Sequence, residues 1–334
     1  MSTDYRVATS GESAGTVLSD DDVEPDAPWS DEPQTRESIV AEAMHGNRLD
    51  KAVVAFVPEF SRAHLQDLIA RGHVSVNGRA VTTASRKVVA GQRIAVELMP
   101  TAQSQAFRPE TLALDIVFED EHLLVLNKPA GMVVHPAAGN WSGTALNGLL
   151  AHHAGAAALP RAGIVHRLDK DTSGLMVVGK TLQAVTALSR AIAAREVHRE
   201  YLAIVHGVLA QRQLRIDAPI ARDPKSRVRM AVVASGKFAL TEVQRLAHGA
   251  RFSAVRCTLH TGRTHQIRVH LAQQGHPLVA DVLYGGAPAL GMQRQALHAT
   301  RLAFAHPLHG QALSFEASPP SDFAAAWARV VEET

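Results

Sequence analysis

The stretch GIVHRLDKDTSGLMVVGKT, residues 163–181, places a cluster of charges between two apolar runs. The apolar runs have the composition of buried strands. Charged side chains in such a setting cost free energy unless they lie on an exposed turn or take part in chemistry. The charges are concentrated in HRLDKD, residues 166–171. Two interpretations follow: an ion-paired turn between strands, or a catalytic loop held between them.

The two carboxylates of this cluster have different neighbours. In an extended chain Asp169 and Asp171 would point to one face about 7 Å apart, which a paired-carboxylate hydrolase could use. Asp171 also begins the turn-forming sequence DTSG, and this favours a structural role for it. Asp169 lies between Arg167 and Lys170, whose charges keep a carboxylate ionised, as a nucleophile requires. From these residues alone, the turn and the catalytic loop remain equally open.

Outward from this stretch, the chain alternates short strand patterns with occasional helical ones. Helical spacing of apolar residues is found at 181–194 and 264–275, the second closed by a glycine. Strand patterns are found at 115–120, 123–129, 174–180, 201–207 and 251–259. Strands outnumber helices and are separated by hairpin-like turns, so we expect an α+β fold with a mixed, largely antiparallel sheet.

Residues 46–100 predict a separate small α/β module. Apolar spacing from Leu49 indicates one short helix, and Ser61 is a favourable N-cap for a second. The dipeptide Asn77-Gly78 between short apolar alternations predicts a β-hairpin. Eight basic and four acidic residues give this segment a net charge of +4, which is compatible with binding a polyanion.

The charge of the whole chain, +2, conceals an asymmetry. Residues 1–40 hold ten acidic and two basic residues, a net charge of −8, so the other 294 residues carry +10. The acidic segment has no sustained apolar period and is typical of a disordered tail. The basic remainder is compatible with nucleic acid as a partner. Residues 101–112 are interpreted as a linker to the larger domain, residues 113–325.

Composition excludes several classes of protein. The single cysteine, Cys257, cannot form an internal disulfide or a cysteine-rich zinc site. No apolar run approaches the roughly 20 residues of a membrane span, and the first residues lack the pattern of a signal peptide. We therefore expect a cytoplasmic protein. Neither a GxGxxG nor a GxxxxGK[ST] motif is present, so dinucleotide and P-loop cofactors have no support.

Three histidines, His260, His265 and His270, recur at intervals of five residues. Helical zinc ligands are usually spaced i, i+4, with a glutamate in HExxH, so a metal site is not expected. Arg199-Glu200-Tyr201 opens a strand pattern, and Arg268 follows the turn that contains Arg263. Arginine suits carboxylates and phosphates, whereas a tyrosine at the start of a strand is often a core residue.

Together these segments resemble one enzyme family. The motifs HRLDKDTSGLMVVGKT, REVHREYLAIVHG and TGRTHQIRVHLAQQGHPLVAD occur in the order and spacing of the ribosomal-large-subunit type of pseudouridine synthases. LLVLNKPAGMVVHPAAGN and QALHATRLAFAHP also match, so the resemblance spans residues 113–312. Among its branches, the D-type, which modifies a stem-loop of large-subunit ribosomal RNA, is the most similar. Residues 61–79, SRAHLQDLIARGHVSVNGR, resemble the small αL RNA-binding module.

The resemblance implies roles for particular residues. Asp169 corresponds to the essential aspartate, Tyr201 to the active-site tyrosine and Arg268 to the basic residue that pairs with the aspartate. Arg167 resembles the arginine that enters the space left by an extruded base. The implied fold has an active-site cleft across the middle of the sheet. In the αL module, the positions that best match RNA-contacting bases are Arg62, Arg71 and Lys87.

The implied activity is the isomerisation of uridine to pseudouridine in large-subunit ribosomal RNA, without cofactor or metal. The implied partner is a ribosomal RNA stem-loop within a pre-ribosomal particle, bound by a monomer and not at a membrane. Alternatives are a synthase that acts on transfer RNA, a non-catalytic ribosome-assembly factor, and a glycoside hydrolase that uses Asp169 and Asp171.

Overall fold

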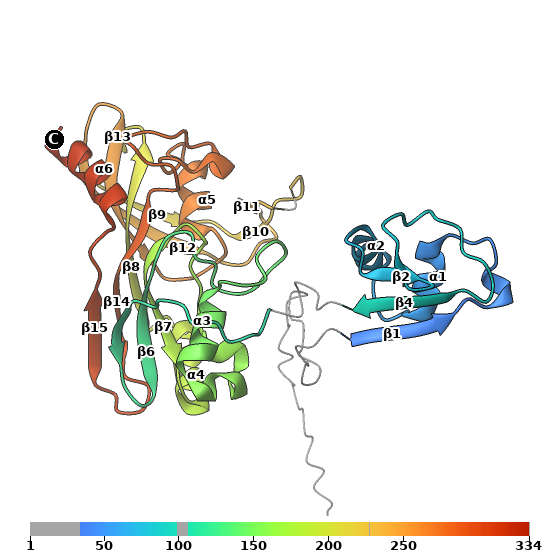
Figure 1. Cartoon of the computed structure of the whole chain (residues 1–334). Coiled ribbons are helices and arrows are strands. Elements are labelled where there is room, and N and C mark those ends of the chain that lie inside the picture. Colours follow the sequence, from blue (N-terminus) through green and yellow to red (C-terminus); the bar gives the residue numbers. More distant parts are fainter. Residues whose placement is uncertain (1–33, 99–105, 227, 334) are drawn as a thin grey trace, which may run out of the picture. The chain divides into compact units, whose positions relative to one another are not determined.

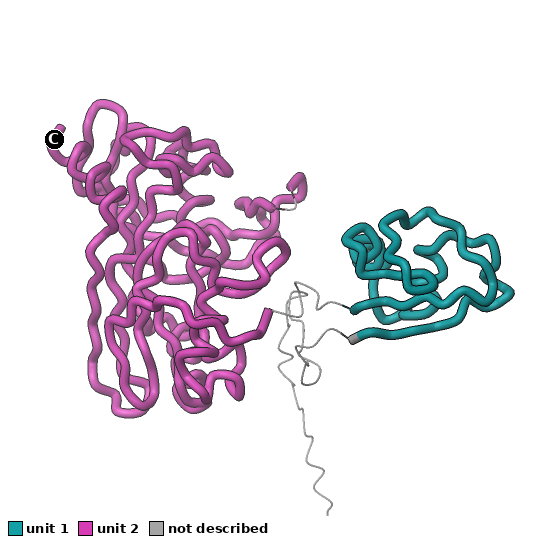
Figure 2. Tube along the Cα trace, viewed as in Figure 1, with its two compact units in different colours: residues 1–100 teal, residues 101–334 magenta. Residues whose placement is uncertain are grey.

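Figure 1 shows the computed structural model of the chain, which describes residues 34–98, 106–226 and 228–333. The chain divides into two units, residues 1–100 and residues 101–334 (Figure 2). Each unit has its own apolar cluster of buried side chains. This division agrees with the small module and the larger domain that the sequence predicts.

The N-terminal unit is a four-stranded antiparallel sheet, in the order β1-β4-β2-β3, with two helices. Ser61 caps the second helix by accepting a hydrogen bond from the His64 amide, and Asn77 and Gly78 both have positive φ in the predicted hairpin turn. Its elements are β1 (Gln34–Ile39), η1 (Glu42–Met44), α1 (Leu49–Phe56), α2 (Arg62–Ala70), β2 (Val74–Val76), β3 (Arg79–Ala80) and β4 (Arg93–Leu98).

The predicted boundary between an acidic tail at 1–40 and a module at 46–100 is wrong. Residues 34–39 form β1, which pairs along its whole length with β4. Its residues 35–39 alternate between exposed and half-buried, as on an edge strand, so the segment has no apolar run that distinguishes it from a tail. The remainder of the predicted tail, residues 1–33, lies outside the described residues.

The C-terminal unit is built around one large mixed sheet. Across residues 106–226 and 228–333 its nine strands follow the order β5-β6-β7-β14-β8-β13-β12-β9, with β15 also pairing β14. Their bounds are β5 (Ile116–Glu119), β6 (Leu123–Lys128), β7 (Ser173–Gly179), β8 (His198–His206), β9 (Gln213–Asp217), β12 (Leu240–His248), β13 (Phe252–Leu259), β14 (Leu297–Ala305) and β15 (Ala312–Glu316).

All neighbouring strands of this sheet run antiparallel except β7 and β14, which run parallel. The predicted α+β class and mixed, largely antiparallel sheet are therefore confirmed. Gly174 permits the β7–β14 pairing: its φ is +112°, and a Cβ there would lie 2.2 Å from the Ala299 carbonyl oxygen. A short hairpin, β10 (Ile220–Arg222) and β11 (Met230–Val232), is separate from the sheet.

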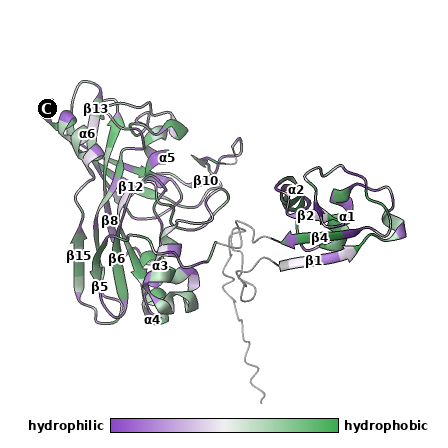
Figure 3. Cartoon of the chain, viewed as in Figure 1, coloured by the Kyte–Doolittle hydropathy of each residue, from purple (hydrophilic) through white to green (hydrophobic). Residues whose placement is uncertain are grey.

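Helices cover this sheet and close its core. Apolar residues gather along the strands (Figure 3), and buried clusters lie on both faces of β6 and β7. The helices are α3 (Ala145–His152), α4 (Leu182–Ala193), α5 (Gln266–Gln273) and α6 (Ser321–Glu332), with short 3₁₀ turns η3 (Ala154–Ala158), η4 (Pro160–Gly163) and η5 (Val282–Tyr284). The expected helices at 181–194 and 264–275 are thus α4 and α5.

Both predicted ends of the larger domain need adjustment. Residue 325 falls inside α6, whose Phe323, Ala326 and Val330 share one buried cluster, so the domain extends to the end of that helix. At the other end, the predicted linker 101–112 overlaps the unit, because the Asn147 side-chain amide donates to the carbonyls of Ala106 and Arg108. Both differences arise from packing against distant residues.

Candidate active site

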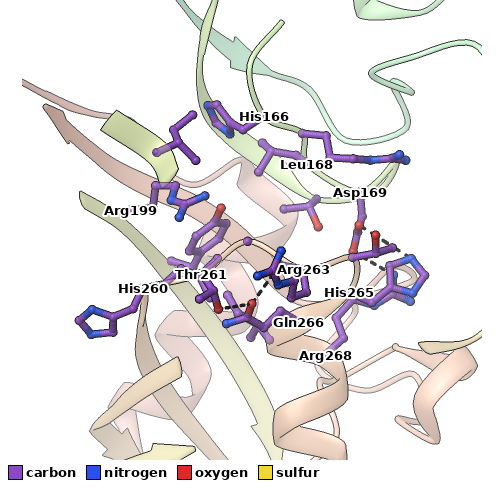
Figure 4. A pocket seen from close by; sticks show the side chains of 18 of the residues that line it. His166, Leu168, Asp169, Arg199, His260, Thr261, Arg263, His265, Gln266 and Arg268 are labelled. Carbon is purple, nitrogen blue, oxygen red and sulfur yellow. Dashed lines mark hydrogen bonds and ion pairs between the residues drawn. The ribbon is translucent and has the colours of Figure 1, made fainter. Parts of the chain in front are cut away.

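A cavity of about 320 Å³ lies over β8, and all three predicted catalytic residues line it. The loop before β7 supplies Asp169, β8 supplies Tyr201, and α5 supplies Arg268. Figure 4 shows Asp169, Arg268 and His265 drawn together on one side of the cavity, with Arg199 on the other. The fold therefore brings together side chains that are far apart in the sequence.

Asp169 begins a tight turn that several groups hold in place. The Thr172 amide donates to the Asp169 carbonyl at 3.1 Å, which closes the turn. The Lys170 carbonyl accepts from the Lys128 Nζ at 3.0 Å, and the Asp171 carbonyl accepts from an Arg294 guanidinium nitrogen at 2.9 Å. The backbone that presents the Asp169 carboxylate is thus fixed from both sides.

Lys128 is fully buried at the end of β6 and anchors this turn. Its Nζ also donates to the carbonyls of Pro129 and Met132, each at 2.9 Å. Burial lowers the pKa of Lys128 to about 7, although the nearby charges of Asp169 and Asp171 act in the opposite direction. Three carbonyl acceptors match the three N–H donors of its ammonium. The sequence contains a signal for this role, because Lys128 ends the apolar strand pattern LLVLNKP. No role was assigned to this lysine from the sequence alone.

Arg268 bridges two carboxylates. Its Nη1 donates to Asp169 Oδ2 at 3.0 Å, while its Nε and Nη2 form a two-pronged pair with Asp281 at 2.7 and 2.8 Å. Burial would lower the pKa of Arg268, but its hydrogen bonds and charge interactions with Asp281 and Asp169 raise it well above the ordinary value. The guanidinium is therefore permanently charged and acts as the counter-ion of the Asp169 carboxylate.

Asp281 was not predicted as a site residue. Its side chain is only 1% exposed, compared with 17% for Asp169, and it fixes the orientation of Arg268. It is the last residue of the motif TGRTHQIRVHLAQQGHPLVAD. The sequence offered one signal for this role, namely that an acidic residue ends a motif that contains an arginine. Only the fold shows that Asp281 returns to Arg268 on α5.

Tyr201 is buried beside the turn that carries Asp169. It belongs to the same apolar cluster as Leu168 and Leu297, which also line the cavity. Burial raises the pKa of the Tyr201 hydroxyl, and the charges of Arg199 and Asp169 both act on it, in opposite directions. The tyrosine thus offers an apolar ring and a neutral hydroxyl to the cavity, close to the Asp169 carboxylate.

His265 and Tyr284 pack around Asp169 and Arg268. The His265 Nδ1 lies 2.7 Å from the Tyr284 hydroxyl, and its Nε2 lies 3.8 Å from Asp169 Oδ1. Burial lowers the pKa of His265, although Asp169 acts to raise it. The Arg268 guanidinium carbon lies 5.0 Å from the centroid of the Tyr284 ring, a cation–π contact that supports the arginine from a further side.

The other predicted residues of HRLDKD separate in the structure. Arg167 lines the cavity and is exposed, whereas Asp171 does not line it. The turn is the one closed by Asp169 and Thr172, so Asp171 lies in its middle and contributes its backbone carbonyl. This placement gives no support to the paired-carboxylate alternative, because Asp169 alone of the two carboxylates reaches the cavity.

In the N-terminal unit the three predicted basic residues do not form one cluster. Arg62 and Arg48 both pair with the fully buried carboxylate of Asp50, at 2.8 and 3.0 Å, and Lys87 pairs with Arg48 through their backbones. Arg71 lies at the other end of α2, in an exposed pair with Asp67. Asp50, which sequence reasoning did not single out, organises the first group.

The histidines spaced by five residues have separate partners. His270 is buried against Thr241 and the Ala218 carbonyl, His265 faces Tyr284, and His260 lies near Glu242. In the part of the chain that the structure describes, no group of three metal-binding side chains is found. Among the same residues, no helix is both long and apolar enough to cross a membrane.

Comparisons with known proteins agree with this architecture. Residues 122–273 match the model of the RNA pseudouridylate synthase family, and residues 47–94 match the S4 domain. The chain resembles the human RNA pseudouridylate synthase domain containing 1, with a TM-score of 0.52 and 27% identity over 65% of this chain and 89% of that one.

Bacterial relatives are more similar still. A protein named ribosomal large subunit pseudouridine synthase D, from Neisseria meningitidis serogroup B, is 48% identical over 83% of this chain and 77% of its own length. A protein of the same name from Nitrosomonas europaea is 46% identical over 87% of this chain and 86% of its own. The chain therefore belongs to the RNA pseudouridylate synthase family and is an RNA pseudouridine synthase, with an S4 domain ahead of its catalytic unit.

Proposed function

We propose that the chain converts particular uridines of large-subunit ribosomal RNA to pseudouridine, with Asp169 as its catalytic carboxylate. The observation that carries the proposal is the pair between Asp169 and Arg268, whose nitrogen and oxygen are 3.0 Å apart in the cavity. The substrate class is supported by the names of relatives from several bacteria, each called ribosomal large subunit pseudouridine synthase D.

The size of the cavity favours a flipped-out nucleotide. A volume of about 320 Å³ is at the small end of the range of ligand sites and suits a single nucleotide rather than a duplex. The target uridine leaves its stack at a cost of a few kcal/mol. Arg167, exposed at this cavity, enters the vacated space and offsets part of that cost.

The reaction exchanges one bond to the ribose for another. The N1–C1′ bond of uridine breaks, the uracil turns within the cavity, and a C5–C1′ bond forms; the proton lost from C5 is balanced by one gained at N1. Asp169 acts on the ribose C1′ or on the base, and Arg268 orients it through their hydrogen bond. The Tyr201 ring stacks on the uracil, and its neutral hydroxyl assists the removal of the C5 proton. Trapping the detached base makes recapture effectively intramolecular.

The N-terminal unit supplies RNA affinity. Arg48 and Arg62, held on buried Asp50, with Lys87 beside them, contact phosphates of a structured RNA. Arg71 adds a contact from the other end of α2. Phosphate contacts make binding salt-dependent, while recognition of the target depends on the shape of its loop and its unstacked bases. The chain acts as a cytoplasmic monomer on a stem-loop in a pre-ribosomal particle, without cofactor or metal.

The decisive experiment substitutes Asp169→Asn. We expect pseudouridine formation in a stem-loop transcript to be abolished, with the Kd for that RNA nearly unchanged. Asp171→Asn is the matched control: it lies two residues away, does not line the cavity and keeps its backbone contact with Arg294, so it should retain most activity. Normal turnover by the Asp169 variant contradicts the assignment.

The substrate is tested by mapping pseudouridine in total RNA from cells with and without the gene. We expect sites to disappear from large-subunit ribosomal RNA and to return with the wild-type gene but not with Asp169→Asn. Loss confined to transfer RNA would replace the proposed substrate. Retention of every site, together with a ribosome-assembly defect, would favour the non-catalytic alternative.

A further inference from the structure

Arg199 is a buried arginine in the cavity that has no role in the mechanism above. It belongs to β8, two residues before Tyr201, so both side chains project from the same face of the strand. Its relative exposure is 5%, and its Nε is buried without a hydrogen-bond partner among the described residues. A Cβ at Gly262 would lie 2.8 Å from its Nη1, which places the guanidinium against the turn that leads into α5.

Three other arginines that line this cavity have partners, and the fourth, Arg167, is exposed to solvent. Arg268 pairs with two carboxylates, the Arg263 Nε donates to the Phe238 carbonyl, and the Arg195 guanidinium stacks on the Phe238 ring. No ion pair involves Arg199 in the described part of the chain. Beside it lies His166, whose pKa is lowered to about 3 by burial and by the Arg199 charge, so this histidine is neutral and adds no second positive charge.

A buried cation without a counter-ion costs several kcal/mol of folding stability. Such an arrangement is favourable for catalysis when an anion forms beside the cation during the reaction, because the cation is already desolvated and fixed in place. The cavity thus combines a carboxylate, that of Asp169, held by Arg268, with the unpaired guanidinium of Arg199 on its opposite side (Figure 4).

We propose that Arg199 stabilises the uracil anion that forms when the N1–C1′ bond breaks. This inference rests on the proposed action of Asp169 on a flipped uridine. An Asp169 carboxylate oxygen bonds C1′ as the N1–C1′ bond breaks, and the bonding pair remains on N1 of the base. The negative charge spreads to the carbonyl oxygens O2 and O4, which accept N–H bonds from the guanidinium. The charge returns to Asp169 when C5 bonds to C1′ and displaces the carboxylate oxygen; C5 then loses its proton and N1 is protonated. Arg199 is therefore a further catalytic residue.

A phosphate of the target nucleotide is the other anion that a guanidinium could bind. The burial of Arg199 and its position next to Tyr201 favour the base. A flipped nucleotide inserts its base most deeply, while its phosphates remain with the backbone outside the pocket. The two sources also differ in what they affect: a phosphate contact changes RNA affinity, whereas a contact made with the detached base changes the rate of bond cleavage.

The test compares Arg199→Met with Arg199→Lys in single-turnover reactions at saturating RNA. We expect Arg199→Met to slow isomerisation about 100-fold, the usual cost of losing one such donor, and Arg199→Lys to recover part of the rate because it keeps the charge. The Kd for RNA should be unchanged. Because the replaced charge was unpaired, the melting temperature of Arg199→Met should equal or exceed that of the wild type.

A second substrate tests the anion itself. Fluorine at C5 withdraws electrons and stabilises a uracil anion, so a transcript with 5-fluorouridine at the target should reduce the defect of Arg199→Met to less than about tenfold. Fluorine also replaces the proton that C5 loses in the normal reaction, so turnover of this substrate is followed as the disappearance of 5-fluorouridine, by chromatography after nuclease digestion. Arg256→Met is the matched control: Arg256 lies on neighbouring β13, outside the cavity lining, near Glu200, and its rate should stay at the wild-type level.

Three outcomes overturn the inference. A raised Kd with an unchanged rate at saturation assigns Arg199 to a phosphate. An equal defect on both substrates, together with a lowered melting temperature, assigns it to structure. A wild-type rate for Arg199→Met removes it from catalysis, while the proposed function stands if Asp169→Asn is inactive in the same assay. Activity in Asp169→Asn instead overturns the function on which the inference rests.

Discussion

The two units use the same ion pair in opposite ways. In the catalytic unit, Arg268 and Asp281 are 8% and 1% exposed, and together they present the Asp169 carboxylate to a cavity. In the N-terminal unit, the carboxylate of Asp50 is the fully buried member, and it presents the guanidinium groups of Arg48 and Arg62, which are 46% and 55% exposed.

The difference shows that the buried member of an arginine–aspartate cluster decides which charge the protein offers. In the catalytic unit, the buried pair of Arg268 and Asp281 holds the carboxylate of Asp169 at the cavity, which suits chemistry on a base that is shielded from water. A buried carboxylate with arginines at its edge suits phosphates, which are bound near water and are screened by salt. Asp281 and Asp50 therefore have equivalent supporting roles, although neither is expected to touch RNA.

Among variants of the residues that support these charges, the largest effect is expected from Arg268→Met. It removes the hydrogen bond to Asp169 and leaves Asp281 as a buried unpaired charge, which costs about 3–5 kcal/mol of unfolding free energy. Turnover should fall on the order of 1,000-fold. Single-turnover kinetics and chemical denaturation measure the two effects on the same preparation.

The double variant Arg268→Met/Asp281→Leu separates support from chemistry. Replacing both buried partners by apolar groups removes the unpaired charge, so stability should return close to the wild type. Activity should stay as low as in the single variant, because Asp169 still lacks its donor. Recovery of activity in the double variant would show that Arg268 serves only to neutralise Asp281.

A second prediction concerns the loss of stability at low pH. The His166 Nε2 accepts from the Val177 amide at 3.0 Å, and burial, aided by the Arg199 charge, lowers its pKa to about 3. The unfolded chain takes up this proton near pH 6.5 and the folded chain does not. Unfolding free energy is therefore lost as the pH falls from 6.5 towards 3, by about 1.4 kcal/mol per unit.

His166→Gln should remove that slope, since glutamine can accept the same bond but does not titrate in this range. The Asp50 carboxyl has its pKa lowered by the Arg48 hydrogen bond, with burial opposing and Arg62 and Gln66 assisting. Its stabilisation is full above pH 4 and is lost only as the pH falls further. Denaturation curves of wild type, His166→Gln and Asp50→Asn at pH 7, 5.5, 4 and 3 compare the two pH ranges in which stability is lost. Loss of both contributions over the same pH range would contradict the assignment.

Local sequence determined much of the fold and less of the site. Helices α2 and α5, with their cap and closing glycine, and the Asn77-Gly78 hairpin were predictable because their signals span a few residues. Edge strand β1 was not, because its half-exposed residues become a strand only through pairing with β4, more than fifty residues later. The predicted ends of the larger domain were wrong for the same reason, because residues 106–108 and α6 join the domain through contacts with residues far away in the sequence.

Asp169, Tyr201 and Arg268 could be predicted because each stands in a recognisable motif, and the structure brings them into one cavity. Asp281 and Lys128 could not, since their importance lies in what they support. Lys128 reaches the carbonyl of Lys170, 42 residues away, and Asp281 reaches Arg268 across a turn. A charged residue in an apolar segment signals such a role, but its partner is visible only in the fold.

A third prediction tests the supporting role of Asp50. Asp50→Asn removes the charge that holds Arg48 and Arg62, so the guanidinium groups become less ordered before binding, and ordering them costs affinity. We expect the Kd for a stem-loop transcript to rise about tenfold with the turnover rate at saturating RNA unchanged. Filter binding and single-turnover kinetics measure the two quantities. A reduced rate at saturation would mean that the N-terminal unit acts on catalysis itself.

The smallest effect on RNA binding is expected for two arginines, Arg62 and Arg71, to which the sequence analysis gave the same role. Arg62 is held on a buried carboxylate, whereas Arg71 pairs only with Asp67, in a contact 68% and 49% exposed. Such surface pairs fix a side chain weakly. Arg62→Gln should therefore weaken RNA binding several-fold more than Arg71→Gln. Each variant should reduce the slope of log affinity against log salt by up to about one unit, if its arginine contacts a phosphate. Equal losses of affinity, measured across a salt series, would show that preorganisation by Asp50 contributes nothing to binding.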